Sequence, residues 1–226
     1  MLGQLTLCPG GRGGAEAGSL YGLSVLRARA DPEGFWGERR LRRAGRSLRR
    51  GGALRVLVPG EFGRWPLLAA LGLRPVETEG FVRAQSAPLA LAGLERRGLA
   101  PDRAAVALRG LRADYAMVRA AAQLCPRVRR LIIDAPGGGA ELAAWLRREF
   151  GVPVLPPGER GALALRFHPA GGRGEEPALA LYGPAPDLGG LTLSAPALAE
   201  GDRADLPLLA ALWEGGKLPP EAIKIT

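Results

Sequence analysis

The sequence contains few of the residues on which metal sites, disulfide frameworks and nucleophilic catalysis depend. It has two cysteines, Cys8 and Cys125, and a single histidine, His168, in 226 residues. Two thiols cannot form a disulfide framework, and a zinc site needs more cysteine and histidine ligands than this chain offers. No serine lies in a Gly-x-Ser-x-Gly elbow, and the Gly-Lys-Ser/Thr triplet of a phosphate loop is missing. The sequence therefore favours a protein without demonstrable catalysis, predicts no metal site, and assigns neither catalytic residues nor a cofactor.

Long apolar runs are absent as well. No stretch approaches the roughly 18–20 apolar residues that a membrane-spanning helix needs. Residues 1–7 show no basic segment followed by an apolar one, which is the pattern of a secretory signal. We therefore expect a cytoplasmic protein with reduced thiols and no membrane partner.

Lysine is nearly absent too, since only Lys217 and Lys224 accompany the arginines among 31 basic residues. This skew, together with abundant alanine, glycine and proline, is typical of a GC-rich genome and says little about function. The formal net charge of +9 is more informative, because it is concentrated between residues 39 and 50, which contain no acid. The arginines of this segment are Arg39, Arg40, Arg42, Arg43, Arg46, Arg49 and Arg50.

This basic segment is predicted to form one helix. The Asp-Pro-Glu sequence at 31–33 suits a helix start, Leu41, Ala44 and Leu48 make a narrow apolar stripe, and Gly51 suits the end. Clustered arginines can bind nucleic-acid phosphates or an acidic protein, or can simply be the solvated face of a helix.

Aromatic residues that could stack on single-stranded bases are scarce beside this helix. Only Phe35 and Trp36 occur near the arginines, and both can belong to the core.

Glycine and proline, with 34 and 20 residues, reach about twice their usual share. The apolar content of 47% is nevertheless sufficient for a folded core. From residue 54 onward, apolar strands alternate with amphipathic helices, which predicts a parallel sheet with right-handed crossovers. The expected strands are 54–59, 74–78, 104–108, 128–133 and 152–155, and the expected helices are 63–71, 87–98, 113–124 and 141–150.

The predicted fold class is α/β, a Rossmann-like three-layer sandwich with a mostly parallel sheet, a short antiparallel β extension and a terminal helix. Segment 1–52 is expected to hold a β-hairpin and the arginine-rich helix, with the hairpin strands at 4–8 and 20–30 on either side of the glycine-rich turn 9–14. Segment 53–157 is expected to hold the Rossmann-like β/α core. Segment 158–226 is expected to be a β-rich extension ending in a helix, and all three are expected to pack as one globular unit. The strands of the extension are expected at 162–167, 178–182 and 191–193, and its helix at 205–214.

The most suggestive segment runs from a buried strand into a helix. Asp134 follows the strand, and Gly137, Gly138 and Gly139 form a turn before the helix. Such a turn lets a ligand approach the backbone, and helix amides at that point favour an anion. The alternative is a turn that uses glycine only to pack the helix closely on the sheet.

This segment resembles the first motif of class I S-adenosylmethionine-dependent methyltransferases, in which a strand ends in an acid followed by a glycine-rich loop. The resemblance covers about a dozen residues, and it implies an S-adenosylmethionine site with a second, ribose-binding acid after the next strand, near Glu159. Pro136 disturbs the motif's spacing, and too few residues follow Glu159 for the rest of that fold.

Two other strand-to-helix junctions carry charged residues. Arg109 and Arg112 follow the strand 104–108, and Glu61 and Arg64 follow the strand 54–59. If these strands and 128–133 are parallel neighbours, the four residues meet Asp134 at one sheet edge. The alternative is that they are separately solvated loop residues.

Four hypotheses about function follow. The first is a small-ligand-binding protein that takes an anion or nucleotide near Asp134, and the second is a nucleic-acid-binding protein that uses the arginine-rich helix. The third is a degenerate nucleotide- or S-adenosylmethionine-dependent enzyme with Asp134 and Glu61 as acid and base. The fourth is a scaffold without small-molecule chemistry.

Overall fold

The computed structural model describes residues 1–60, 62–171 and 174–226, and the predicted alternation of strands and helices forms an α/β fold of Rossmann-like type. Contacts divide the chain into two compact units, each made of two segments. Unit 1 comprises Met1–Glu77 and Ala197–Pro219, and unit 2 comprises Thr78–Pro196 and Pro220–Thr226. Contacts therefore group the chain differently from the compositional segments 1–52, 53–157 and 158–226.

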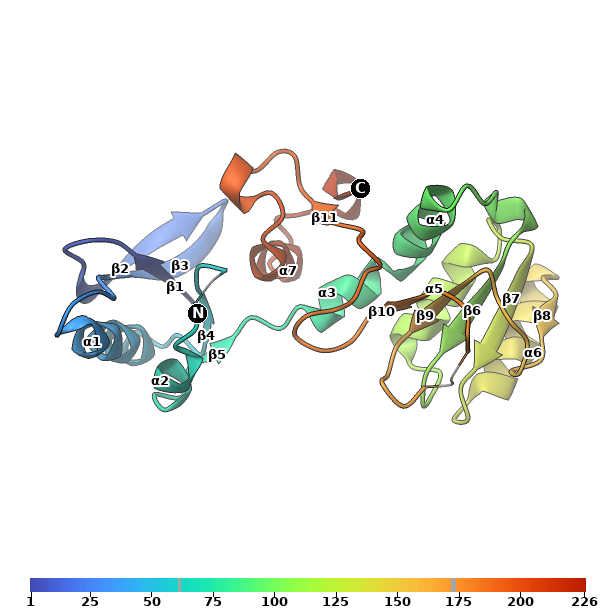
Figure 1. Cartoon of the computed structure of the whole chain (residues 1–226), viewed down its shortest axis with the longest axis horizontal. Helices are drawn as coiled ribbons and strands as arrows, with labels where there is room; N and C mark the ends of the chain where they lie inside the picture. Colours follow the sequence, from blue (N-terminus) through green and yellow to red (C-terminus); the bar gives the residue numbers. More distant parts are fainter. Residues whose placement is uncertain (61, 172–173) are drawn as a thin grey trace. The chain divides into compact units, whose positions relative to one another are not determined.

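Unit 1 is built on a five-stranded, mostly parallel sheet with the order β2-β3-β1-β4-β5 (Figure 1). Among the described strands of this sheet, only the β2–β3 pair is antiparallel, and it forms a hairpin. The expected hairpin of strands 4–8 and 20–30 is wrong, because β1 pairs with β3 in parallel and the glycine-rich segment leads into β2 instead. The strands are β1 (Leu2–Leu7), β2 (Arg12–Leu20), β3 (Leu23–Ala30), β4 (Arg55–Leu57) and β5 (Arg74–Pro75). Because β4 belongs to this sheet, the assumption that strand 54–59 neighbours strands 104–108 and 128–133 is wrong.

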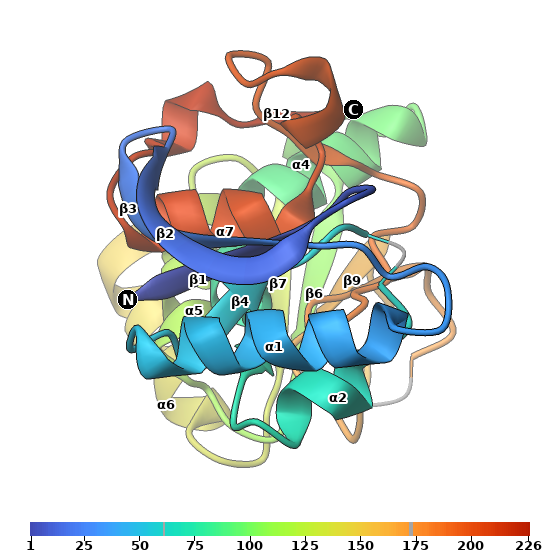
Figure 2. The ribbon, with the colours of Figure 1, turned by 90° about the vertical axis from the view of Figure 1, so that its left-hand side faces the viewer.

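Helices of unit 1 lie on both sides of its sheet. They are α1 (Gly37–Arg50), α2 (Trp65–Ala69) and α7 (Leu206–Glu214). Figure 2 shows α1 and α7 on opposite sides of the strands. The predicted stripe of α1, Leu41, Ala44 and Leu48, is fully buried in the core with Leu5 and Val56. Amphipathic patterning thus correctly predicted which face of α1 packs on the sheet.

The start of α1 differs from the prediction. The helix begins at Gly37 rather than at the Asp-Pro-Glu sequence, because the Asp31 carboxylate accepts hydrogen bonds from the backbone N–H groups of Glu33 (3.0 Å) and Gly10 (3.1 Å). Asp31 therefore holds a turn together. A side chain at Gly37 would collide with the carbonyl oxygen of Pro32, so glycine permits the chain to turn into the helix there.

Unit 2 contains a five-stranded, fully parallel sheet with the order β10-β9-β6-β7-β8. The chain leaves β6 toward β7 and β8, and then returns to β9 on the other side of β6, so the sheet is doubly wound. Its strands are β6 (Ala105–Arg109), β7 (Arg130–Asp134), β8 (Val154–Leu155), β9 (Leu163–Arg166) and β10 (Ala178–Ala180). Its helices are α3 (Glu79–Ala84), α4 (Ser86–Arg96), α5 (Tyr115–Leu124) and α6 (Gly139–Phe150).

The expected antiparallel extension is present only in part. β11 (Leu193–Ser194) and β12 (Lys224–Ile225) form a short antiparallel pair, but β9 and β10 extend the parallel sheet. The chain returns from β8 to β9 in parallel without a helix between them. A Cβ at Gly161 would lie 3.1 Å from the carbonyl oxygen of Ala105, so the crossing segment nearly touches the sheet backbone.

The two faces of this sheet are covered differently. The face with Ile133 and Leu163 packs against helices, since Gly139 of α6 lies against Ile133 and Gly93 of α4 lies against Leu163. The opposite face carries Ala107, Ile132 and Ala164, all fully buried. Polar side chains gather at the carboxyl ends of β6 and β7, where Arg109 contacts Asp134 and the carbonyl oxygen of Glu159. Three single-turn 3-10 helices complete the described chain, at Pro101–Arg103, Glu200–Asp202 and Pro220–Ala222.

Within the described residues, no helix is long and apolar enough to cross a membrane.

Candidate functional site

The last residue of β6, Arg109, is buried at the carboxyl edge of the unit 2 sheet. Its Nε donates to Glu176 Oε1 at 2.7 Å, and its two terminal nitrogens lie 2.5 Å from Asp134 Oδ2 and 2.6 Å from Glu176 Oε1. A terminal N–H also donates to the carbonyl oxygen of Glu159 at 3.1 Å. The parallel register places Arg109 beside Asp134 on the neighbouring strand, which explains the first ion pair. The predicted meeting of Arg109 with Asp134 therefore occurs, and the two side chains are bonded to each other.

Glu176 completes this cluster from the segment that precedes β10. Its side chain is 1% exposed, compared with 21% for Asp134. Glu176 Oε2 is buried and has no hydrogen-bond partner among the residues that the structure describes. A buried carboxylate oxygen without a partner costs free energy, on the order of 1–3 kcal/mol or more. Gly174 lies directly against this oxygen, where a Cβ would collide with it.

A cavity of about 300 Å³ opens at these groups, and we call it the Arg109 cavity. Its charged lining holds four carboxylates and two guanidinium groups, so the lining is acidic on balance. The lining residues are Arg109, Asp134, Pro157, Gly158, Glu159, Arg160, Gly174, Glu175 and Glu176. Within the part of the chain that the structure describes, no group of three or more histidine, cysteine, aspartate or glutamate residues is placed to hold a metal ion.

The glycine turn after Asp134 is engaged with the protein's own backbone. Gly137 donates to the carbonyl oxygen of Leu111 at 3.0 Å and accepts from the N–H of Ala113 at 2.7 Å. Gly138 has a φ of +78°, which glycine adopts without strain. A Cβ at Gly137 would lie 3.1 Å from the Cβ of Arg112, an exposed residue that does not line the Arg109 cavity. These contacts match the alternative in which glycine serves close packing.

The switch point of the doubly wound sheet, between β6 and β9, is occupied by the chain. A Cβ at Gly171 would lie only 2.6 Å from the Cα of Gly110, so the segment after β9 sits directly on the end of β6. His168 holds this segment in place, because its Nδ1 accepts the N–H of Ala170 at 3.0 Å and its carbonyl accepts the N–H of Gly171 at 3.0 Å. Open α/β sheets usually bind ligands at this position. Here the lone histidine has a local structural role.

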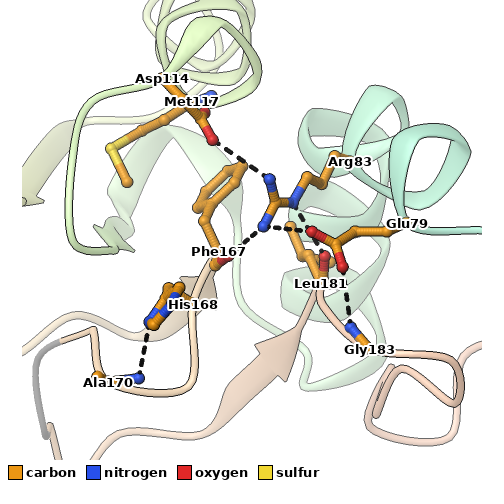
Figure 3. Close-up of polar contacts among 9 residues, drawn as sticks. All are labelled: Glu79, Arg83, Asp114, Met117, Phe167, His168, Ala170, Leu181 and Gly183. Atoms are coloured by element: carbon orange, nitrogen blue, oxygen red, sulfur yellow. Dashed lines mark hydrogen bonds and ion pairs between the residues drawn. The ribbon is translucent and has the colours of Figure 1, made fainter.

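A second polar cluster centres on Arg83 of α3, which the sequence did not single out (Figure 3). Arg83 pairs with Glu79 at 2.7 Å and with Asp114, the N-cap of α5, at 3.3 Å. It also donates to the carbonyl oxygens of Phe167 and Leu181, which follow β9 and β10. Every donor group of the guanidinium is thereby used, so this cluster joins two helices to two strand ends.

The other predicted residues do not join the Arg109 cavity. Glu61 lies outside the described residues. Arg64 is exposed in unit 1, where it precedes α2 and donates to the carbonyl oxygen of Pro32 at 3.3 Å. Sequence reasoning missed Glu176, although the Glu175–Glu176 pair directly before an apolar strand resembles the acid-bearing junctions that it did single out.

The arginines of α1 are exposed except for Arg40, which is half-buried and lies 3.1 Å from Asp31. We call the exposed set the arginine surface, and it comprises Arg39, Arg42, Arg43, Arg46, Arg49 and Arg50. Phe35 and Trp36, which the sequence allowed in the core, are instead 92% and 51% exposed. Both precede Gly37, where α1 begins, so the packing of the helix on the sheet does not cover them.

No family model matches the chain, and no curated protein matches it. Among solved structures, L-tryptophan dehydrogenase from Nostoc punctiforme aligns with 64% of this chain and 44% of its own length, at 17% identity and a TM-score of 0.34. The chain thus spans less than half of that dehydrogenase. Arylmalonate decarboxylase aligns with 69% of this chain and 86% of its own, at 17% identity and a TM-score of 0.23. At these values the likeness says nothing about activity.

Proposed function

We propose that unit 2 binds a small organic cation, one carrying an amino or guanidino group, in the Arg109 cavity. The observation that carries this proposal is Glu176, a buried carboxylate whose Oε2 lacks a hydrogen-bond donor among the described residues. A ligand N–H group would supply the missing donor. The proposal keeps the small-ligand hypothesis and Asp134 as a binding residue, and it changes the charge of the ligand.

The donors of the cavity argue against an anionic ligand. The Arg109 guanidinium already donates to Glu176, Asp134 and the carbonyl of Glu159, so it has little to offer a phosphate or carboxylate. Acceptors, by contrast, are in excess, because Asp134 uses only Oδ2 in its ion pair. A cation therefore gains hydrogen bonds and charge complementarity, whereas an anion would face several carboxylates at close range.

The rim of the cavity contributes less than its base. Glu175 and Arg160 have side chains that are 92% and 66% exposed, and their charged atoms are 3.8 Å apart. Water screens charges at such positions, so they contribute little to affinity. The buried Glu176 carboxylate, together with the half-buried Asp134, is expected to determine which ligand binds.

Thermal unfolding of the full chain tests the proposal with defined probes. Methylguanidine, agmatine and spermidine represent the cations, and inorganic phosphate, ATP and S-adenosylmethionine represent the ligands of the other hypotheses. A ligand at 100 times its dissociation constant adds about 2.7 kcal/mol of stability, which raises the melting temperature by several degrees. We expect this shift with a cation and none with phosphate or ATP.

Calorimetric titration of two variants separates the cavity from general charge. Glu176→Gln should weaken cation binding at least about tenfold, because it removes the buried negative charge. Glu141→Gln makes the same change at an exposed position on α6 and should leave the affinity unchanged. Circular dichroism confirms that each variant is folded. Stabilisation by phosphate or ATP alone, equal losses in both variants, or no shift with any probe would each overturn the proposal, and the last result favours a scaffold.

A further inference from the structure

Unit 1 presents an exposed row of arginines next to two exposed aromatic rings. We infer that this surface binds single-stranded nucleic acid. The inference is independent of the Arg109 cavity, because it concerns residues of unit 1 alone.

Most guanidinium groups of the arginine surface are not neutralised by a neighbouring carboxylate among the described residues. Arg42 pairs with Glu38 at 2.6 Å, one turn away on the same helix. Arg43, Arg49 and Arg50 form no ion pair or side-chain hydrogen bond with the described residues, and Arg46 donates only to a backbone carbonyl of its own helix. A helix rises 1.5 Å per residue, so the row extends over about 16 Å. That length suits several successive phosphates of one strand.

The aromatic pair adds a platform on which bases can stack. The rings of Phe35 and Trp36 meet edge to face, with centroids 4.9 Å apart and planes at 85°. The guanidinium carbon of Arg39 lies 5.2 Å from the centroid of the Trp36 ring, which couples the platform to the basic row. A partner that covers these rings gains the free energy of burying their apolar surface. Aromatic rings beside a basic track are how many proteins hold single-stranded nucleic acid.

A hollow beside α1 offers a second place for a base. It has a volume of about 400 Å³ and lies between α1 and α2, with Leu67, Ala70 and Leu71 as apolar lining and Arg42 and Arg46 as charged lining. A bound nucleotide needs an apolar surface against its base and a positive charge near its phosphate. The hollow provides both.

Nucleic acid suits this surface better than a membrane does. A membrane-binding amphipathic helix inserts its apolar face, but the apolar stripe of α1 is fully buried against the sheet. At the start of α1, the exposed apolar side chains that could insert are Phe35 and Trp36. The apolar stripe of α1 is already packed on the sheet, so the helix offers a partner its row of arginines. Such a row suits a linear polyanion.

Fluorescence anisotropy with a labelled 20-nucleotide oligo(dT) and oligo(U) tests the inference on the full chain. We expect binding that weakens steeply between 50 and 200 mM salt, and weaker binding to a duplex of equal length, whose bases cannot reach the platform. Vesicles containing phosphatidylserine serve as the membrane arm. Binding to vesicles without binding to the oligonucleotides, or equal affinity for duplex and single strand, would overturn the inference.

Two sets of substitutions assign the binding to this surface. Replacing four arginines of α1 by glutamine should reduce the salt slope by about 3, since each lost phosphate contact on a single strand contributes about 0.7. The same number of exposed arginines in unit 2, replaced by glutamine, gives a control with an identical change in net charge. The test set is Arg43, Arg46, Arg49 and Arg50, and the control set is Arg119, Arg127, Arg129 and Arg148.

The platform is tested separately with Phe35→Ala, a change at an exposed position. It should weaken oligonucleotide binding at least about fivefold while leaving the salt slope unchanged, because stacking does not release counterions. Equal losses in the test and control sets would show that general positive charge, and not this surface, binds the strand. Unchanged affinity in Phe35→Ala would remove the platform from the inference and reduce it to phosphate binding.

Discussion

Removing Arg109 should destabilise unit 2 strongly, because it leaves the Glu176 carboxylate buried without a counter-charge. In Arg109→Leu the side chain of Glu176, 1% exposed, loses both of the contacts that Arg109 provides to its Oε1. Breaking a buried ion pair by removing one partner costs about 3–5 kcal/mol. Asp134, at 21% exposure, can still reach water and contributes less.

The cost should be much smaller when both buried charges are removed together. The double variant Arg109→Leu with Glu176→Leu no longer buries an ion, and apolar residues of similar volume can replace such a pair at little cost. We expect the double variant to be more stable than Arg109→Leu by more than about 1 kcal/mol, which is a coupling of the size found between contacting residues. Arg160→Leu is the control, since its side chain is 66% exposed and should change stability by less than about 0.5 kcal/mol.

Thiol labelling of Cys125 in a Cys8→Ser background reports unit 2 alone. Cys125 is buried at the end of α5, so it reacts with a thiol reagent only when unit 2 opens. With a urea m-value of about 1–3 kcal/mol per molar, the labelling midpoint of Arg109→Leu should fall by at least about 1 M. If the double variant were as unstable as Arg109→Leu, or if Arg160→Leu matched it, the cost would not come from the buried carboxylate.

Four further outcomes are expected. Asp205 caps α7 by accepting the N–H of Leu208 at 3.0 Å, so Asp205→Ala should cost about 1 kcal/mol in urea unfolding of unit 1, whereas Asp205→Asn keeps the cap. Burial raises the pKa of Asp205, so the folded state binds the Asp205 proton more tightly than the unfolded state does. The contribution of Asp205 to the free energy of unfolding therefore declines as the pH rises through that pKa. Asp205→Asn should abolish this decline, and an unchanged pH profile of stability would refute the assignment. Burial also raises the pKa of Cys125 to about 11, so mass spectrometry after a short exposure to iodoacetamide at pH 8 should find Cys8 modified and Cys125 free, and equal labelling would contradict the burial. Gly171→Ala places a Cβ against backbone atoms and should lower the free energy of unfolding by about 1–3 kcal/mol. A Cβ at Gly158 meets nothing within 4 Å, so Gly158→Ala is the control and should be tolerated. Equal melting temperatures of the two variants would refute the close approach at Gly171.

Much of the secondary structure follows from local patterning. The stripe of Leu41, Ala44 and Leu48 correctly predicted the buried face of α1, and the apolar run before Asp134 correctly predicted β7. The start of α1 did not follow from its capping sequence, because Asp31 bonds to a residue 21 positions away in the chain. A long-range hydrogen bond of this kind leaves no local signal.

The candidate site was predictable only in part. The pairing of Arg109 with Asp134 followed from the rule that parallel strands present their carboxyl ends at one edge, since both residues lie at such ends. The same rule failed for Arg64, because β4 belongs to a different sheet and strand order depends on contacts between distant segments. Glu176 could not be placed either, because it lies in a connection without a repeating pattern.

The sequence by itself determined the α/β class, the excess of basic charge on one helix, and the shortage of catalytic side chains, because composition and hydrophobic periodicity are local properties. Only the tertiary structure decided which strands are neighbours, that Arg109 is bonded to two carboxylates, and that Phe35 and Trp36 lie exposed beside the arginines. The physical reason is that these features depend on which segments exclude water from one another, and a single α/β rhythm is compatible with several such arrangements.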